Sequence, residues 1–333
     1  MSESAYAKAG VDQGAADSAV AGLVRALGAI ELGRPSLQVP LPGHYASVIR
    51  IDERLGIALS TDGVGTKLLV AEELGRFDTV GIDCVAMNVN DVICVGAEPL
   101  AMLDYIAVQQ ADAKVCEEIG VGLARGAELA GVEIPGGELA QLGELVSSVD
   151  VSGACFGTVA LDSIIDGSAV RAGDPVIGLP SSGIHSNGYT LARSALDGIP
   201  LGDERLGRPL GEVLLEPTVI YVKAVVELLR SEVEVRGLAH ITSGGTDNLL
   251  RLAADVGYEI DDPLPVPPVF DLIQECGAVS DREMHEVFNM GCGFCCVVSP
   301  DDEEEALRLL RTHYPDAKRI GRAVEGPREA RLA

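Results

Sequence analysis

Three stretches of this chain place glycine and hydroxyl-bearing residues directly after an apolar run. They span residues 59–67, 179–189 and 240–248. A glycine loop after a strand exposes consecutive backbone N–H donors, and a following helix adds the positive end of its dipole, so such a junction can cradle a phosphate. Turn glycines explain any single junction equally well, but three together favour phosphate binding. None of them matches the P-loop or the dinucleotide-binding glycine pattern.

Four acidic residues occupy unusual places for a surface carboxylate. They are Asp62 at the end of an apolar run, Asp91 on an apolar helical pattern, Asp104 within an apolar strand pattern, and Glu138 after the Pro-Gly-Gly sequence at 135–137. A buried carboxylate is costly unless it is paired or binds a metal. Hard oxygen ligands at loop and strand ends suit Mg²⁺ bridged to phosphate. The alternative is that these residues cap turns or pair with arginine.

Lys67, His185 and His240 could supply charge and proton transfer at the three junctions. Lys67 closes the first glycine loop, where an ammonium can contact phosphate as a point charge, although a solvated loop lysine is the simpler explanation. His185 and His240 lie in the second and third junctions of a chain with only five histidines. Both suit proton transfer or a phosphate contact, and a hydrogen-bonded turn histidine is the alternative.

The one close group of cysteines is Cys292, Cys295 and Cys296. No second pair and no histidine at ligand spacing follows it. We interpret this group as a buried strand that uses cysteine as a small apolar residue, in preference to a metal or redox site.

The elements that must position these residues alternate between strand-like and helix-like patterns, which indicates an α/β or interleaved α+β fold. Strands are expected at 48–51, 57–61, 100–108, 150–161, 175–179, 238–242, 293–299 and 318–324. Helices are expected at 79–95, 113–130, from 189, at 216–230, 248–255 and 303–312. The turn-rich stretch 162–174 separates two halves, so we predict domains at 1–165 and 166–333.

Composition narrows the classes of function. Lysine and arginine total 25 against 51 acidic residues, a formal net charge of −26 in 333 residues. This balance argues against binding of nucleic acid or of an anionic membrane, because both need a basic face. No apolar run reaches the ~18 residues of a membrane span, and the N-terminus lacks a secretory signal pattern. A cytoplasmic protein is therefore expected.

These motifs together resemble the phosphoribosylformylglycinamidine cyclo-ligase family, also called AIR synthetase. The similar stretches follow in order along the chain: 9–12, 61–67, 81–91, 96–99, 103–105, 136–138, 180–189, 217–223, 239–245 and 288–291. The 180–189 motif with the 217–223 block is specific to this family within its superfamily. The altered 33–43 loop and the shortened 139–144 loop depart from many members, and the shorter form resembles archaeal-type members.

The resemblance implies a two-domain fold. Its N-terminal sheet forms a barrel shared by a homodimer, and a C-terminal α/β layer domain packs on it. It also implies an enzyme of purine biosynthesis that uses ATP and Mg²⁺ to convert formylglycinamidine ribonucleotide to aminoimidazole ribonucleotide, ADP and phosphate. The formamide oxygen attacks the γ-phosphate, and an amidine nitrogen then displaces the phosphate and closes the ring.

The resemblance also implies roles by matched position. Asp62, Asp91 and Glu138 are the expected Mg²⁺ ligands. Lys67, His185 and His240 are the expected catalytic residues, with His185 preferred for proton transfer. The expected ATP-binding and phosphate-binding residues are Asp62, Gly63, Gly65, Thr66, Asp104, Ser182, Gly183, Ser186, Asn187, Thr242, Gly244 and Gly245.

Two alternatives stay open at this point. One is another ATP-using member of the same superfamily, either a small-molecule kinase or a phosphate-transferring synthetase. The other is a non-catalytic nucleotide-binding regulatory dimer, against which the retained acidic residues and His185 argue.

Overall fold

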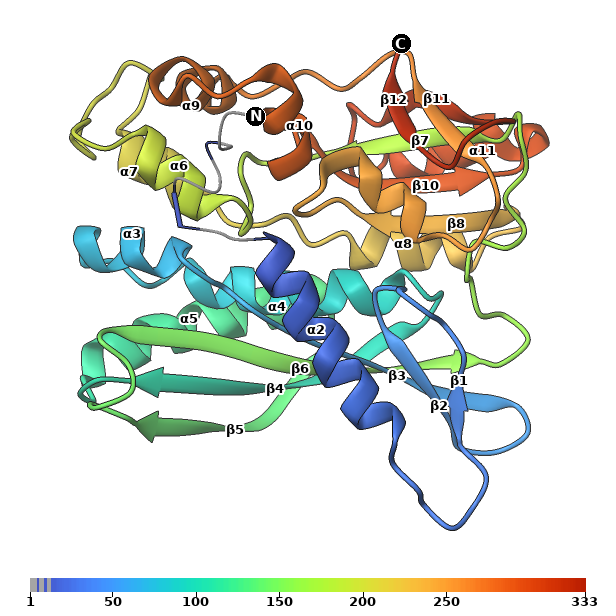
Figure 1. The fold of residues 1–333 in the computed structure, drawn as a ribbon, viewed down its shortest axis with the longest axis horizontal. Coiled ribbons are helices and arrows are strands. Elements are labelled where there is room, and N and C mark those ends of the chain that lie inside the picture. The colour runs from blue at the N-terminus through green and yellow to red at the C-terminus, as the bar shows by residue number, and fades with distance from the viewer. Residues whose placement is uncertain (1–4, 6–8, 11–12) are drawn as a thin grey trace.

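Two six-stranded sheets, one from each half of the chain, form separate layers of the molecule (Figure 1). The computed structural model describes residues 5, 9–10 and 13–333, so residues 11 and 12 of the expected 9–12 motif lie outside the described part. In that part, no helix is long and apolar enough to cross a membrane.

The first sheet has the strand order β1-β2-β3-β6-β4-β5 and is antiparallel except between β4 and β5. Its strands are β1 (Gln38–Val39), β2 (Ser47–Arg50), β3 (Leu55–Gly63), β4 (Glu98–Val108), β5 (Glu133–Gln141) and β6 (Val149–Ala160). Along β6, buried and half-buried residues alternate, which is the period of a strand with one face on a core. The other face of this sheet is more open.

Helix α4 (Val80–Ile93) covers the buried face of the first sheet and also contacts the second sheet. It is buried on nearly every side, and its apolar sequence is interrupted by four polar residues, Asp83, Asn88, Asn90 and Asp91. It crosses α5 (Ala113–Ala130) at a very close approach. A Cβ added to Gly81 would lie 2.2 Å from the backbone nitrogen of Leu123, so glycine is required there.

The second sheet has the order β12-β9-β11-β7-β10-β8. Its strands are β7 (Pro175–Pro180), β8 (Val235–His240), β9 (Gly257–Ile260), β10 (Cys292–Val298), β11 (Lys318–Val324) and β12 (Ala330–Leu332). Strand β10 is buried along its whole length. The interpretation of the cysteine group as a buried strand is therefore confirmed.

The remaining helices connect and cover these layers. They are α2 (Gln13–Gly28), α3 (Lys67–Leu74), α6 (Tyr189–Ala195), α7 (Leu210–Leu214), α8 (Val222–Leu229), α9 (Pro268–Gly277), α10 (Asp281–Val287) and α11 (Glu303–Leu310), with the 3₁₀ helices η1 (Gly245–Arg251) and η2 (Pro300–Asp302).

Two expected helices differ from the observed elements. The helix expected at 216–230 begins only at Val222, and in place of the helix expected at 248–255 the 3₁₀ helix η1 ends at Arg251. Several elements were not predicted, namely α2, α3, α7, α9, α10, β1, β5, β9 and β12. The residues directly before α8 stay irregular because their backbone groups bond to buried side chains of the first half, as described below.

Candidate functional site

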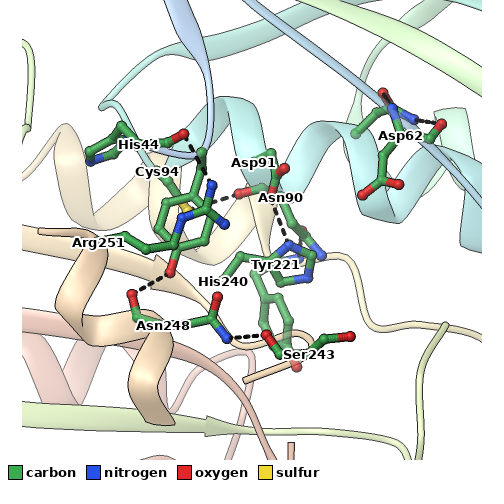
Figure 2. A network of polar contacts seen from close by, with 12 residues as sticks. His44, Asp62, Asn90, Asp91, Cys94, Tyr221, His240, Ser243, Asn248 and Arg251 are labelled. Atoms are coloured by element: carbon green, nitrogen blue, oxygen red, sulfur yellow. Dashed lines mark hydrogen bonds and ion pairs between the residues drawn. The ribbon is translucent and has the colours of Figure 1, made fainter. Parts of the chain in front are cut away.

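Asp91 and His240 meet where α4 approaches the end of β8 (Figure 2). Nδ1 of the fully buried His240 lies 2.9 Å from Oδ1 of Asp91. A carboxylate accepts hydrogen bonds, so this contact places the imidazole proton on Nδ1 and leaves the lone pair on Nε2. That Nε2 atom is buried and has no hydrogen-bond partner among the described residues. His240 therefore presents an unused acceptor.

His185 has the same tautomer but uses its other nitrogen. It lies in the loop after β7 with a left-handed backbone (φ 65°), and its Nε2 accepts a hydrogen bond from the Ser182 backbone N–H at 3.2 Å. The proton must then be on Nδ1, which is buried and bonds to nothing in the described chain. Burial, with smaller effects of His240 and Lys67, holds the pKa of His185 well below its usual value. His185 is thus neutral and presents an unused N–H donor.

Lys67 lies in a buried ion pair, contrary to the expected position at a solvent-facing phosphate. Its ammonium contacts Oδ2 of Asp83 at 2.8 Å, and both side chains are fully buried. It also donates to the backbone carbonyls of His185 at 3.1 Å and Glu216 at 2.7 Å. The ammonium has three donors, and these three partners use them. Lys67 therefore positions the His185 loop in this arrangement and has no donor left for a phosphate.

The irregular segment 216–221 completes this buried junction between the two halves. Thr218 donates to Oδ1 of Asp83 from its backbone N–H at 2.8 Å and from its hydroxyl at 2.6 Å. Asn90 donates to the Val219 carbonyl at 2.8 Å and accepts from the Tyr221 N–H at 3.0 Å. A helix over 216–221 would remove these bonds and leave the polar side chains of α4 unpaired.

Asp62 ends β3 beside α4. Its backbone exchanges two hydrogen bonds with the Asn88 side chain, at 3.0 and 3.1 Å. Burial raises the pKa of the Asp62 carboxyl, and the Asp91 charge adds to the rise, while the Gly63 N–H, His240 and Arg251 oppose it. The Asp91 charge therefore acts on the Asp62 carboxyl. Carboxylate oxygens are ligands that Mg²⁺ prefers, so these two side chains have the chemistry of Mg²⁺ ligands.

Glu138 does not join this pair within one chain. The strand register aligns Asp62 with Gly153, Gly153 with Asp104, and Asp104 with Gly137. Paired residues share a face of a sheet, and the next residue along a strand points to the other face. Glu138 therefore points away from the α4 side and is exposed. Within the described ranges, no group of three or more histidine, cysteine or acidic residues could hold a metal.

Asp104 lies in the same row as Asp62, on the α4 side of the sheet. It is half-buried, and burial raises the pKa of its carboxyl. Its carboxylate lies directly over Gly137, because a Cβ added there would be 2.3 Å from Oδ1. This close approach explains the glycine before Glu138.

Each glycine loop contains a glycine with a left-handed backbone, but several hydroxyls of these loops are already engaged. Gly65, Gly183 and Gly244 have left-handed backbones (φ 71°, 147° and 99°). The Ser182 hydroxyl donates to the Pro217 carbonyl at 2.6 Å, and the Ser186 hydroxyl to Asp83 at 3.1 Å. Three other predicted residues also place polar side chains at these loops. The Thr66 hydroxyl lies 3.2 Å from that of Thr190, and Thr242 is half-buried. The Oδ1 atom of Asn187 is buried and has no hydrogen-bond partner within the described part of the chain.

The third glycine loop, residues 240–248, is fixed in place by α10 and by the Asn248 side chain. A Cβ added to Gly245 would lie 2.1 Å from the His285 carbonyl oxygen, so the loop backbone touches α10 there. The Asn248 side chain donates to the carbonyls of Ser243 at 2.9 Å and Gly245 at 3.0 Å. These bonds hold the loop at the start of η1.

Sequence reasoning gave no role to Asp83, Thr218 or Arg251. Asp83 carries the signal that identified Asp91, a carboxylate in an apolar helix, and could have been found in the same way. Thr218 and Arg251 carry no such signal, because their partners are more than a hundred residues away.

Comparisons with known proteins agree with this organisation. The family models for "AIR synthase related protein", N-terminal and C-terminal domains, match residues 43–159 and 171–332. The chain is 54% identical over 274 residues to phosphoribosylformylglycinamidine cyclo-ligase of Methanothermobacter thermautotrophicus, covering 80% of each protein. It is 48% identical over 327 residues to the protein of that name from Pyrococcus furiosus, covering 97% of this chain and 96% of the relative.

Solved structures share the fold at lower identity. HypE of E. coli, a hydrogenase maturation protein, superposes with a TM-score of 0.64 at 19% identity over 86% of each chain. AaThiL complexed with AMPPCP and TMP superposes with a TM-score of 0.63 at 18% identity over 88% of each chain. At these identities the likeness concerns the fold alone.

Proposed function

The chain belongs to the phosphoribosylformylglycinamidine cyclo-ligase family of ATP-dependent enzymes in de novo purine biosynthesis, and from this we propose how its residues close the imidazole ring. The substrate would be formylglycinamidine ribonucleotide, and the products aminoimidazole ribonucleotide, ADP and phosphate. The observation that carries the assignment of roles is the pair of unused buried nitrogens, one donor on His185 and one acceptor on His240.

Ring closure needs an activated formamide oxygen and a proton acceptor. The oxygen attacks the γ-phosphorus of ATP, the bond to ADP breaks, and an imidate phosphate forms. The amidine nitrogen then attacks the same carbon, phosphate leaves with the oxygen, and the nitrogen loses its proton. His240 Nε2 suits the acceptor role, with Asp91 stabilising the imidazolium that forms. His185 Nδ1–H suits a donor to an oxygen that gains negative charge.

Asp62 and Asp91 are the proposed Mg²⁺ ligands. Mg²⁺ usually takes one or two carboxylates together with substrate phosphates and water, so a third protein ligand is not needed. The bound ion would neutralise charge on the transferring phosphoryl group. Asp62 would be oriented by its backbone bonds to Asn88. Asp104, which lies on the same face of the sheet two strands away, would support the ATP site from there. Glu138 would contribute only from the other face.

The phosphates of both nucleotides would bind to the backbone N–H groups of the three glycine loops. Lys67 would act by holding the His185 loop, because its donors are engaged. We further propose that residues 1–165 form the ATP-binding and dimerisation domain and residues 166–333 the second domain of a cytoplasmic protein.

A homodimer with a shared barrel is proposed from the open face of the first sheet. Leu103 and Tyr105 lie side by side on this face and are 41% and 42% exposed. Leu59 and Phe156 extend the face on neighbouring strands and are only half-buried. A second copy of the sheet would cover these apolar side chains.

The test is substrate-dependent formation of ADP. Purified protein with ATP and Mg²⁺ should release ADP only when formylglycinamidine ribonucleotide is added, with aminoimidazole ribonucleotide formed in equal amount. ADP release that ignores this ribonucleotide would favour another kinase-like activity, and none at all would favour a regulatory dimer.

A further inference from the structure

Arg251, at the end of η1, extends its side chain back to the first half of the chain. It donates from Nε to the Gly43 carbonyl at 2.9 Å and from Nη2 to the His44 carbonyl at 3.1 Å. Its guanidinium carbon lies 4.0 Å from the centre of the Tyr45 ring. Tyr45 in turn donates its hydroxyl proton to the Asn248 carbonyl at 2.8 Å. These contacts fix the plane and direction of the guanidinium, and Figure 2 shows the bond between Arg251 and His44.

This cation has no carboxylate partner among the residues described. Its two bonded atoms lie on one edge of the guanidinium, and both partners are neutral carbonyls. Nη1 forms no hydrogen bond to the described chain, so the edge made by Nη1 and Nη2 keeps free donors. That edge is the planar fork with which arginine binds carboxylate or phosphate in a bidentate manner.

Figure 2 shows the guanidinium in the same polar network as Asp91 and His240. Asp91 and Arg251 act on the pKa of the same groups with opposite sign: the Asp91 charge raises, and the Arg251 charge lowers, the pKa of His44 and of the Tyr45 hydroxyl. Arg251 also lowers the pKa of Asp62. It leaves from the end of the 3₁₀ helix that follows the third glycine loop. The ammonium of Lys67 already donates to Asp83 and to two backbone carbonyls. Arg251, in contrast, still has N–H donors without a partner in the described part of the chain.

We propose that Arg251 binds a phosphate group of one of the two nucleotides, through the free edge of its guanidinium. A rigid guanidinium held by neutral groups retains its whole charge for a ligand. An arginine already paired with a carboxylate would not. This inference rests on the proposed nucleotide site, because that reaction supplies the phosphate ligands. The bound group would lie near the third glycine loop, at the end of η1.

The test compares Arg251→Ala and Arg251→Lys with Arg328→Ala. Arg328 is a matched control because it also holds η1 through backbone carbonyls, those of Leu250 and Leu252, without lying at the site. The KM values for ATP and for formylglycinamidine ribonucleotide are measured separately. We expect Arg251→Ala to raise one of them by about 10- to 100-fold, which is the usual loss for a hydrogen bond to a charged group. The affected substrate identifies the phosphate.

Arg251→Lys should fall between the wild type and Arg251→Ala, because lysine keeps the charge but not the fork. Inorganic phosphate, as product inhibitor, should also bind more weakly to both variants. Unchanged KM values, or an equal rise in Arg328→Ala, would overturn the proposal and leave Arg251 a structural role. The wild-type chain is assayed first for ribonucleotide-dependent ADP release, so a failure of the proposed function is recognised separately.

Discussion

At the scale of single residues, two buried histidines with the proton on the same nitrogen, Nδ1, leave different nitrogens free. Ser182 donates to Nε2 of His185, which leaves its Nδ1–H free, and Asp91 accepts from Nδ1 of His240, which leaves its Nε2 lone pair free. The sequence suggests proton transfer for both histidines but does not show which atoms they face. A local loop contact decides this for His185, and a contact between the two halves of the chain decides it for His240.

These tautomers predict unequal effects of conservative substitutions. His240→Gln keeps a polar atom at the Nε2 position but cannot take a proton, so kcat should fall by about 10²–10⁴-fold. His185→Asn keeps an N–H at the Nδ1 position and should cost clearly less than His185→Leu. Steady-state kinetics with thermal unfolding as a folding control measures both. A larger loss in His185→Asn than in His240→Gln would contradict the assignment.

His44 predicts a pH dependence of stability. Burial lowers its pKa to about 4, and the nearby Arg251 charge adds to the effect. The unfolded chain, with a histidine pKa near 6.5, binds the proton first as pH falls. The free energy of unfolding should therefore drop between pH 6.5 and 4, by about 3 kcal/mol from this residue. Urea unfolding at several pH values should show a shallower drop in His44→Gln than in the wild type.

The control for this experiment is the exposed His313, which pairs with Glu227 at 2.7 Å. His313→Gln should keep the steep wild-type dependence in the acid range. An equal flattening in both variants would assign the effect to general charge instead of the buried imidazole.

At the scale of elements, periodic segments were predictable and segments fixed by distant partners were not. The helix expected at 113–130 is α5, and the strand expected at 318–324 is β11. In each segment the spacing of apolar residues matches one type of secondary structure, a helix in the first and a strand in the second. The segment 216–221 has the pattern of a helix start, with proline in the first turn, but its backbone groups bond to Asp83 and Asn90. Tertiary hydrogen bonds there outweigh the local preference.

The buried pair of Lys67 and Asp83 predicts a non-additive stability change. Lys67→Met leaves a fully buried carboxylate without its cation and should cost about 3–5 kcal/mol of unfolding free energy. Adding Asp83→Asn removes that charge, so the double variant should be more stable than Lys67→Met alone. Urea unfolding of the four proteins completes the cycle. Additive losses would mean that the two side chains do not depend on each other.

An exposed ion pair provides the comparison for this cycle. Arg282 contacts Glu286 at 2.6 Å on α10, and the arginine is largely exposed. Arg282→Met should change the unfolding free energy by less than about 1 kcal/mol.

Two adjacent glycines of β5 predict contrasting results. Gly137 lies beneath the Asp104 carboxylate, whereas a Cβ added to Gly136 would meet no atom within 4 Å. Gly137→Ala should push Asp104 out of place and destabilise the protein by about 1–3 kcal/mol. Gly136→Ala should have little effect. Thermal unfolding separates the two, and equal stability of both variants would disprove the close approach.

At the scale of the whole molecule, the charge of −26 must be reconciled with two anionic substrates. The lysine expected to help, Lys67, is paired with Asp83, and the proposed site instead combines loop N–H groups, the Asp62 and Asp91 carboxylates, and Arg251. The sequence suggested the loops and carboxylates because glycine and acidic residues in apolar segments are visible in a pattern. It did not separate Glu138 from Asp62, because that separation depends on strand register across β3, β6, β4 and β5.

The open face of the first sheet predicts the oligomeric state. If this face is buried in a dimer, Tyr105→Asp should place a charge in an apolar interface and yield monomers in analytical ultracentrifugation. Val121 on α5 is also an exposed apolar residue, 56% exposed, but lies outside that face, so Val121→Asp should leave the dimer intact. A shared barrel further requires ring-closing activity to fall in Tyr105→Asp and to recover with rising protein concentration. A wild-type chain that sediments as a monomer, or a dimeric Tyr105→Asp, would exclude this face as the interface.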